Sequence, residues 1–66
     1  MLNDAAMYAT VYQFEALENG VVVRHTVFRT RESIERRGGT ILDETGKQVL
    51  GYEVMEGMWK PDRNPR

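Results

Sequence analysis

The residues best suited to binding chemistry form a cluster of arginines near the middle of the chain. Guanidinium groups make planar, bidentate contacts with phosphates and carboxylates, so such a cluster can bind nucleic acid or an acidic protein surface. Two glutamates lie within the same stretch, and Gly38-Gly39 ends it. The candidate partner-binding arginines are Arg29, Arg31, Arg36 and Arg37.

The two glutamates weaken the phosphate-binding interpretation. On a helix, Glu35 lies four residues from Arg31, and side chains at that spacing are neighbours. Glu32 lies beside Arg36 in the same way. Mixed charge of this kind is typical of a helix face that contacts water or another protein. We therefore prefer a protein partner. The alternative is a nucleic-acid-binding protein that uses the arginine-rich helix and the basic tail.

A second candidate contact is Met58-Trp59, which lies just before the basic end of the chain. Tryptophan often anchors protein interfaces, and methionine adapts its shape to different partners. The competing interpretation is that Trp59 folds back onto the core, because a domain this small needs its large apolar side chains inside. The sequence leaves both roles open, so Met58 and Trp59 join the candidate partner-binding residues.

Catalysis has little support in this sequence. His25 is the only histidine, the residue type best suited to proton transfer at neutral pH. Ser33 is the only serine, and no aspartate lies at a spacing typical of nucleophilic catalysis. A strand histidine packed on an aromatic neighbour is the simpler interpretation of His25. The sequence predicts a protein that is not an enzyme and has no catalytic residues.

The motifs that bind common cofactors and metals are missing from the chain. It has no cysteine, which excludes disulfides and thiolate zinc sites. The segment DETGK lacks the alternating acids of a calcium-binding EF-hand loop. Neither the Gly-Lys pair at 46–47 nor Gly38-Gly39 belongs to a phosphate-binding glycine pattern. We therefore expect no cofactor and no metal.

Size predicts self-association. A chain of 66 residues buries only about 60% of the surface that its unfolded form exposes, so its core is small. Small domains usually gain support from disulfides, a metal or a partner chain. Because cysteine is absent, a partner chain is the natural support, and we expect a homodimer.

Charge and hydropathy limit the other partners. The net charge is −1, so no strong field attracts the whole molecule to nucleic acid. No run of 18 apolar residues could span a membrane, and the first residues lack the basic, then apolar, pattern of a signal peptide. We expect a cytoplasmic protein with no membrane partner.

The strongest structural signal is Asn19-Gly20, the preferred pair for a two-residue type I′ hairpin turn. It separates two runs rich in β-branched and aromatic residues. With this turn, one face of the hairpin is mostly apolar and the other is polar in its middle, a sorting that a slip of one residue would destroy. The predicted facing pairs are Glu18–Val21, Leu17–Val22, Ala16–Val23, Glu15–Arg24, Phe14–His25, Gln13–Thr26, Tyr12–Val27 and Val11–Phe28.

Two of these pairs place apolar residues on the polar face. Leu17 with Val22, and Val11 with Phe28, lie at its two ends. Such residues are either covered by another part of the chain or form an exposed patch that marks an interface.

A helix of about two turns is predicted over residues 31–37. Thr30 is a suitable N-cap, Glu32 favours the helix dipole in the first turn, and Gly38-Gly39 is a strong stop signal. Ile34 is its only apolar residue, so we expect the helix to pack by one side chain.

The rest of the chain completes an α+β fold. Residues 40–55 read as two strands around a turn at 44–47, and a helix over 47–55 is the competing prediction. We expect an antiparallel sheet of three to four strands with one short helix, in the order β-β-α-β-β. The domain should occupy 7–59, between a flexible leader at 1–6 and a disordered basic tail at 60–66.

Overall fold

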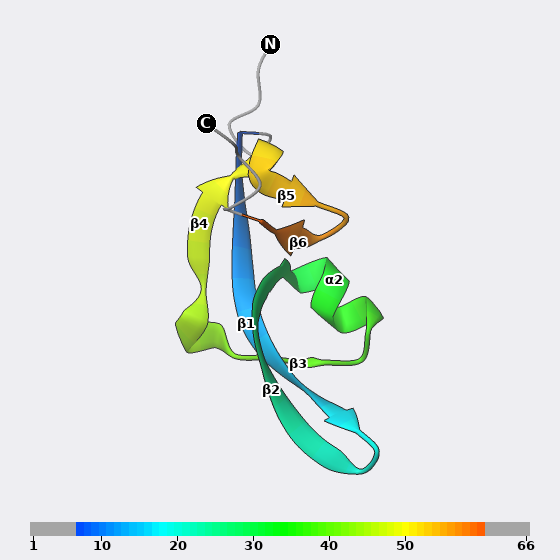
Figure 1. Ribbon diagram of the computed structural model, residues 1–66. Coiled ribbons are helices and arrows are strands. Elements are labelled where there is room, and N and C mark those ends of the chain that lie inside the picture. Colours follow the sequence, from blue (N-terminus) through cyan, green and yellow to red (C-terminus); the bar gives the residue numbers. More distant parts are fainter. Residues whose placement is uncertain (1–6, 61–66) are drawn as a thin grey trace.

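The computed structural model describes residues 7–60 and shows one antiparallel sheet with one short helix (Figure 1). The strands are β1 (Tyr8–Glu18), β2 (Val21–Thr30), β3 (Thr40–Ile41), β4 (Lys47–Leu50), β5 (Val54–Met55) and β6 (Met58–Trp59), and the helix is α2 (Arg31–Arg36). The strand order is β3-β1-β2-β6-β5, and β4 also pairs with β1. The α+β class is confirmed. The expected three to four strands are wrong, because the sheet has six.

The expected leader at 1–6 lies outside the described residues, as does the expected tail beyond Lys60. Lys60 itself donates its backbone N–H to the carbonyl oxygen of Glu53 at 3.1 Å. The domain therefore makes a backbone contact at the first residue of the expected tail.

The hairpin between β1 and β2 turns at Asn19-Gly20, as predicted. Both residues have positive φ, 57° and 79°, which is the type I′ requirement. The predicted register is confirmed from the turn as far as the pair Phe14–His25.

Beyond Phe14 the predicted register is wrong. Tyr12 lies opposite Arg29, and Val11 lies opposite Thr30, each two residues further along β2 than expected. A bulge absorbs the extra residues, and the side-chain amide of Gln13 donates to the carbonyl oxygen of Thr26 at 2.9 Å there. Bulges bend and twist a strand, and β2 curves strongly in Figure 1.

The second edge of β1 carries two short strands. β3 pairs with Phe14 and Glu15, and β4 pairs with residues 8–11. Between them a single turn of 3-10 helix, η1 (Asp43–Thr45), crosses the gap, where the hydroxyl of Thr45 accepts the N–H of Gln13 at 2.8 Å. Between Val11 and Glu15, β1 therefore has bonding partners on both of its edges.

Neither prediction for residues 47–55 holds over the whole segment. β4 ends at Leu50, a 3-10 turn η2 (Gly51–Glu53) follows, and β5 begins at Val54. A tight turn at Glu56-Gly57, with φ values of 53° and 81°, then leads into β6. The backbone N–H of Thr30 donates to the Gly57 carbonyl at 2.9 Å, which joins this second hairpin to the end of β2.

The predicted helix is confirmed to within one residue. The Thr30 hydroxyl accepts the N–H of Ser33 at 3.2 Å, the capping bond expected at an N-cap. Ile34 is fully buried, and Gly39 lies so close that an added Cβ would be 3.1 Å from both Ile34 and Phe14. In Figure 1 the helix lies between β3 and the β5–β6 hairpin.

The core is thin. Its four buried apolar residues among those described are Val11, Phe14, Ile34 and Val49. Side chains alternate along a strand, so Val11 and Phe14 point to opposite faces of β1. Helix α2 covers the Phe14 face through Ile34. The sheet thus buries a little surface on each side rather than a broad face on one.

The two apolar ends of the hairpin differ in how far they are buried. Val11 is completely buried, so that end is covered by the rest of the fold. Leu17 and Val22 are 71% and 62% exposed. We call residues 16–23 the hairpin arm, because they extend past the last β1 residue paired with β3.

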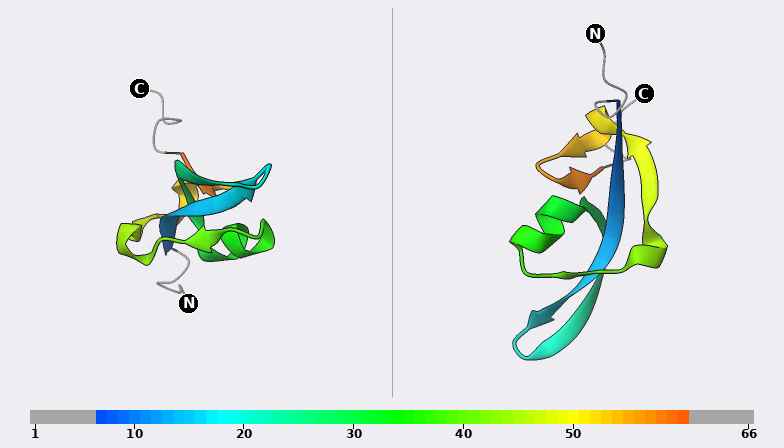
Figure 2. Two further views of the ribbon diagram at one scale, coloured as in Figure 1. Left: turned by 90° about the horizontal axis from the view of Figure 1, so that it is seen from below. Right: turned by 180° about the vertical axis from the view of Figure 1, so that it is seen from behind.

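The hairpin arm gives the molecule an elongated shape. The longest dimension is 46 Å and the shortest is 20 Å. The view from behind shows the β1–β2 turn projecting away from the other strands and the helix (right view of Figure 2).

The fold predicts different costs for two glycine substitutions. Gly57→Ala and Gly20→Ala both force alanine into positive φ, which costs about 1 kcal/mol. At Gly57 the new Cβ would also lie 2.7 Å from the Ser33 Cβ, whereas Gly20 is open. We expect Gly57→Ala to lower the free energy of unfolding by about 3 kcal/mol in total, measured by urea denaturation. Equal losses at the two positions would contradict this packing of Gly57 on the helix.

Candidate functional site

The hairpin arm carries the most exposed cluster of apolar side chains in the hairpin. Leu17, Val21 and Val22 are 71%, 59% and 62% exposed; Leu17 lies directly opposite Val22 on one face of the hairpin, and Val21 points to the other face. Single exposed apolar residues are common on proteins, but a cluster of them on a projecting element is typical of an interface.

The outer edge of β2 is open along the same arm. β2 pairs with β1 on one edge, and on the other it meets β6 only at Arg29. From Val21 to Phe28 this edge has no strand partner among the described residues. An open edge with β-branched residues offers unpaired backbone groups to another strand.

A shallow hollow of about 190 Å³ connects the arm to the end of the helix. Its lining residues are Glu15, Ala16, Leu17, Val22, Gly38 and Thr40. The apolar side chains of the arm thus continue into a small concave surface at the base of the arm, where a partner could bury them.

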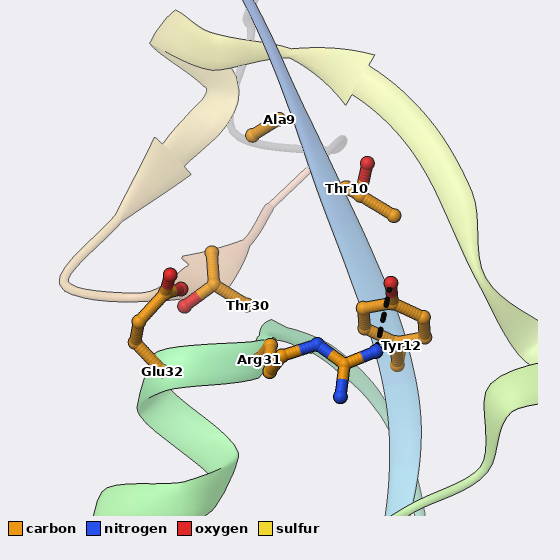
Figure 3. Close-up of a pocket in the computed structure, with 6 residues that line it drawn as sticks. All are labelled: Ala9, Thr10, Tyr12, Thr30, Arg31 and Glu32. Carbon is orange, nitrogen blue, oxygen red and sulfur yellow. Dashed lines mark hydrogen bonds between the residues drawn. The ribbon is translucent and has the colours of Figure 1, made fainter. Parts of the chain in front are cut away.

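Arg31 is held in place by Tyr12. Its guanidinium carbon lies 5.1 Å from the centre of the Tyr12 ring, and Nη2 lies 3.4 Å from the Tyr12 hydroxyl (Figure 3). That hydrogen bond is the main cause of a raised pKa for Arg31, and the carboxylate of Asp43, 3.5 Å away, adds to it. Because Arg31 already has these partners within the fold, it is less available to bind a separate molecule.

A second hollow, of about 320 Å³, opens next to Arg31. It is lined by Ala9, Thr10, Tyr12, Thr30, Arg31 and Glu32. Arg31 and Glu32 approach it from the helix, and Thr10 and Tyr12 from β1 (Figure 3). Because Arg31 and Glu32 place opposite charges at its rim, this hollow does not favour an anion.

Arg29 and Arg37 form a positively charged site whose charge no nearby carboxylate neutralises in residues 7–60. Arg29 is half-buried, and its Nη1 donates to the hydroxyl of Ser33 at 3.0 Å. Burial, and then the nearby charge of Arg37, lower the pKa of Arg29. Within residues 7–60 neither arginine has a carboxylate at ion-pair distance, and neither does Arg36.

The four candidate arginines therefore do not form one patch. Arg31 stacks on Tyr12 at the start of α2, while Arg36 and Arg37 are exposed at its end. The neighbouring pair Glu32–Arg36 makes no ion pair in the described part of the chain.

Trp59 packs inside the fold. Its ring meets Phe28 edge to face at a centroid distance of 5.4 Å, and its indole N–H donates to Glu53 at 3.0 Å. The ammonium of Lys47 lies 4.6 Å from the Trp59 ring centre. These contacts favour the core interpretation of Trp59. Met58 precedes it and lies opposite Arg29.

His25 stacks on Phe14, as the register predicts. The ring centroids are 4.7 Å apart and nearly parallel, and Nε2 lies 2.7 Å from a carboxylate oxygen of Glu18. Ser33 lies in helix α2, where it is buried and accepts a hydrogen bond from Arg29. His25 and Ser33 are therefore held by different partners.

Sequence patterns missed the contacts made by Lys47 and Tyr12. Lys47 follows a turn, and nothing in the neighbouring sequence indicates that it contacts Trp59, which is twelve residues away. Tyr12 was expected opposite Val27, and only the bulge in β2 brings Arg29 and the start of the helix next to it. Knowledge of the bulge would have been needed to find the contact between Tyr12 and Arg31.

The described residues show no further site of a known type. Helix α2, with six residues, is far too short to cross a membrane, and no other described helix could do so. Within residues 7–60 no three histidine or carboxylate side chains gather as metal ligands.

Comparison with protein-family models, with curated proteins and with solved structures gives no significant match. The function is therefore inferred from the residues and their geometry alone.

The packing of Trp59 predicts a loss of stability rather than a loss of binding alone. Trp59→Ala removes the Phe28 and Lys47 contacts and leaves Glu53 without its donor, so unfolding should become easier by about 2 kcal/mol. Tyr52→Ala is the matched control, because Tyr52 is 71% exposed. Urea denaturation measures both. A Trp59→Ala variant as stable as the parent would return Trp59 to the candidate interface.

Proposed function

We propose that this chain is a small cytoplasmic binding protein, not an enzyme, which acts through protein–protein contacts and forms a homodimer. The observation that carries the proposal is the hairpin arm, with Leu17, Val21 and Val22 exposed on an element that projects from the domain. Burial of these side chains against a partner releases water from apolar surface, which is the main driving force of association.

The thin core supports this proposal. A domain of this size gains stability when a partner buries additional apolar surface. The arm supplies such surface without loss of the internal core, because the buried residues Val11, Phe14 and Ile34 lie outside it. The candidate contact surface is therefore centred on the arm, while Trp59 and Met58 support the fold beside the end of β2.

Substitution on the arm tests the proposal. Leu17→Asp should weaken self-association, because it places a charge in the apolar surface of the arm beside the contact, and it should leave the monomer folded. Tyr52→Asp is the control, since Tyr52 is also 71% exposed but lies in η2, away from the arm. Sedimentation velocity over a range of concentrations measures the dimer fraction. If both variants lose association, or neither does, the arm is not the contact.

A nucleic-acid-binding role is the second candidate, and one observation favours it. Arg29 and Arg37 are close enough for their charges to interact, and Arg36 is exposed beside them. Arginines without a carboxylate partner can bind phosphate oxygens at no cost in broken ion pairs.

Salt dependence tests this second candidate. If the arginines bind phosphates, affinity for a duplex or single-stranded oligonucleotide should fall steeply with salt, because binding releases condensed counterions. Arg36→Ala with Arg37→Ala should reduce the salt slope by about 2. Fluorescence anisotropy of a labelled oligonucleotide measures both. Binding that is absent at low salt, or that the double substitution leaves unchanged, removes this candidate.

A further inference from the structure

The open edge of β2 presents only a short run of unpaired backbone groups. On β1, the N–H of Gln13 donates to Thr45 and its carbonyl accepts the N–H of Leu42 at 3.0 Å. Gln13 therefore turns its backbone away from β2. Because the backbone direction alternates along a strand, Phe14 and Ala16 turn towards β2.

The facing residues on β2 follow the same alternation. His25 and Val23 lie opposite Phe14 and Ala16, so their N–H and C=O groups point to β1. Val22 and Arg24 consequently point their backbone groups outwards, to the open edge. The bulge ends this run, because the carbonyl of Thr26 turns inwards to the amide of Gln13.

We propose that the partner on this edge is a second copy of the same chain, with the two β2 strands antiparallel around a two-fold axis at Val23. This inference rests on the proposed function and adds its geometry. With the axis at Val23, Val22 of each copy forms a hydrogen-bonded pair with Arg24 of the other, so all the outward groups of both residues are used.

The side chains support the same register. Val23 lies directly opposite Val23 of the second copy in the closer, non-hydrogen-bonded type of pair, and Val21 lies opposite His25. The two Arg24 residues do not lie directly opposite each other, and each still lies opposite Glu15 of its own copy.

The neighbouring registers are worse. An axis at Arg24 sets two arginines directly opposite each other, which is unfavourable. An axis at His25 pairs Arg24 with Thr26, whose carbonyl is already engaged by Gln13. An axis at Val22 leaves Arg24 opposite Gly20 in the turn, where no strand continues.

Net charge and shape permit this pairing. Each copy carries a net charge of −1, so two copies repel only weakly. The arm projects away from the helix and the β5–β6 hairpin (right view of Figure 2), which leaves the outer edge of β2 accessible to a second arm. The apolar side chains Leu17 and Val22 of both copies then lie on one face of a continuous sheet.

Two valine substitutions on β2 test the edge. Val23→Lys sets two lysines directly opposite each other across the axis and should weaken the dimer about tenfold. Val27→Lys is the control, because Val27 is 44% exposed on the same strand but outside the paired segment. Sedimentation equilibrium gives the dissociation constants, and circular dichroism checks that each variant is folded.

Single cysteines test the register independently of stability. The chain has no cysteine, so one introduced thiol can pair only between copies. Val23→Cys should form a disulfide-linked dimer under mild oxidation, since the Cα atoms of such a pair are about 4.5 Å apart. Val22→Cys is more exposed but should not, because its counterpart would lie beyond the disulfide limit of about 7 Å.

The outcomes separate this inference from the proposed function. Cross-linking at residue 23 alone, with weakening by Val23→Lys alone, is the predicted result. The unsubstituted protein can also form a dimer that Val23→Lys does not weaken and that Val23→Cys does not cross-link. That result overturns the β2 pairing but leaves self-association in place. Stronger cross-linking at Val22 than at Val23 overturns the register. A parent that stays monomeric at roughly 1 mM overturns both the pairing and the homodimer.

Discussion

The whole structure depends on β1 having pairing partners on both of its edges. β2 pairs with one edge from Val11 onwards, and β3 and β4 share the other, which fixes residues 11–15 of β1 at the centre of the sheet. Val11 and Phe14 lie in this doubly paired part and point to opposite faces, and each is almost completely buried. The helix joins the same centre through Ile34. Where the second edge of β1 loses its partner, after Glu15, burial ends as well.

This constraint explains why the hairpin arm keeps apolar side chains exposed. After the helix, residues 37–60 flank the first part of β1 and return through β5 and β6 to the end of β2. Within residues 7–60 no strand pairs with the outer edges of the hairpin arm. Leu17 and Val22 stay exposed there, and the edge of β2 stays open, although both are made of residues that favour burial and strand pairing. A contact between arms would extend the sheet at the place where the chain itself does not.

Local signals predicted the parts of the fold that local interactions determine. Asn19-Gly20 set the turn and the register next to it, and Thr30 and Gly38 set the two ends of the helix. The bulge in β2 depends on a contact between Gln13 and Thr26, thirteen residues apart, so periodicity could not reveal it. The two-residue strands β3, β5 and β6 are too short to carry a pattern, which is why six strands were not expected. For the candidate site, sequence identified Leu17 with Val22 as an unexplained apolar pair. It could not show which end of the hairpin would be covered, because that depends on where β4 and β6 dock.

The most direct test of the account is hydrogen exchange at single amides of β2, measured by NMR at several protein concentrations. The account predicts that the amides of Val23 and His25, bonded to β1, are protected at every concentration. The amides of Val22 and Arg24 should exchange rapidly in dilute solution and slow down as concentration rises, because only a second copy covers them. Protection of Val22 and Arg24 at the lowest concentration, or rapid exchange at the highest, would contradict the central claim that the open edge of the hairpin is the contact surface.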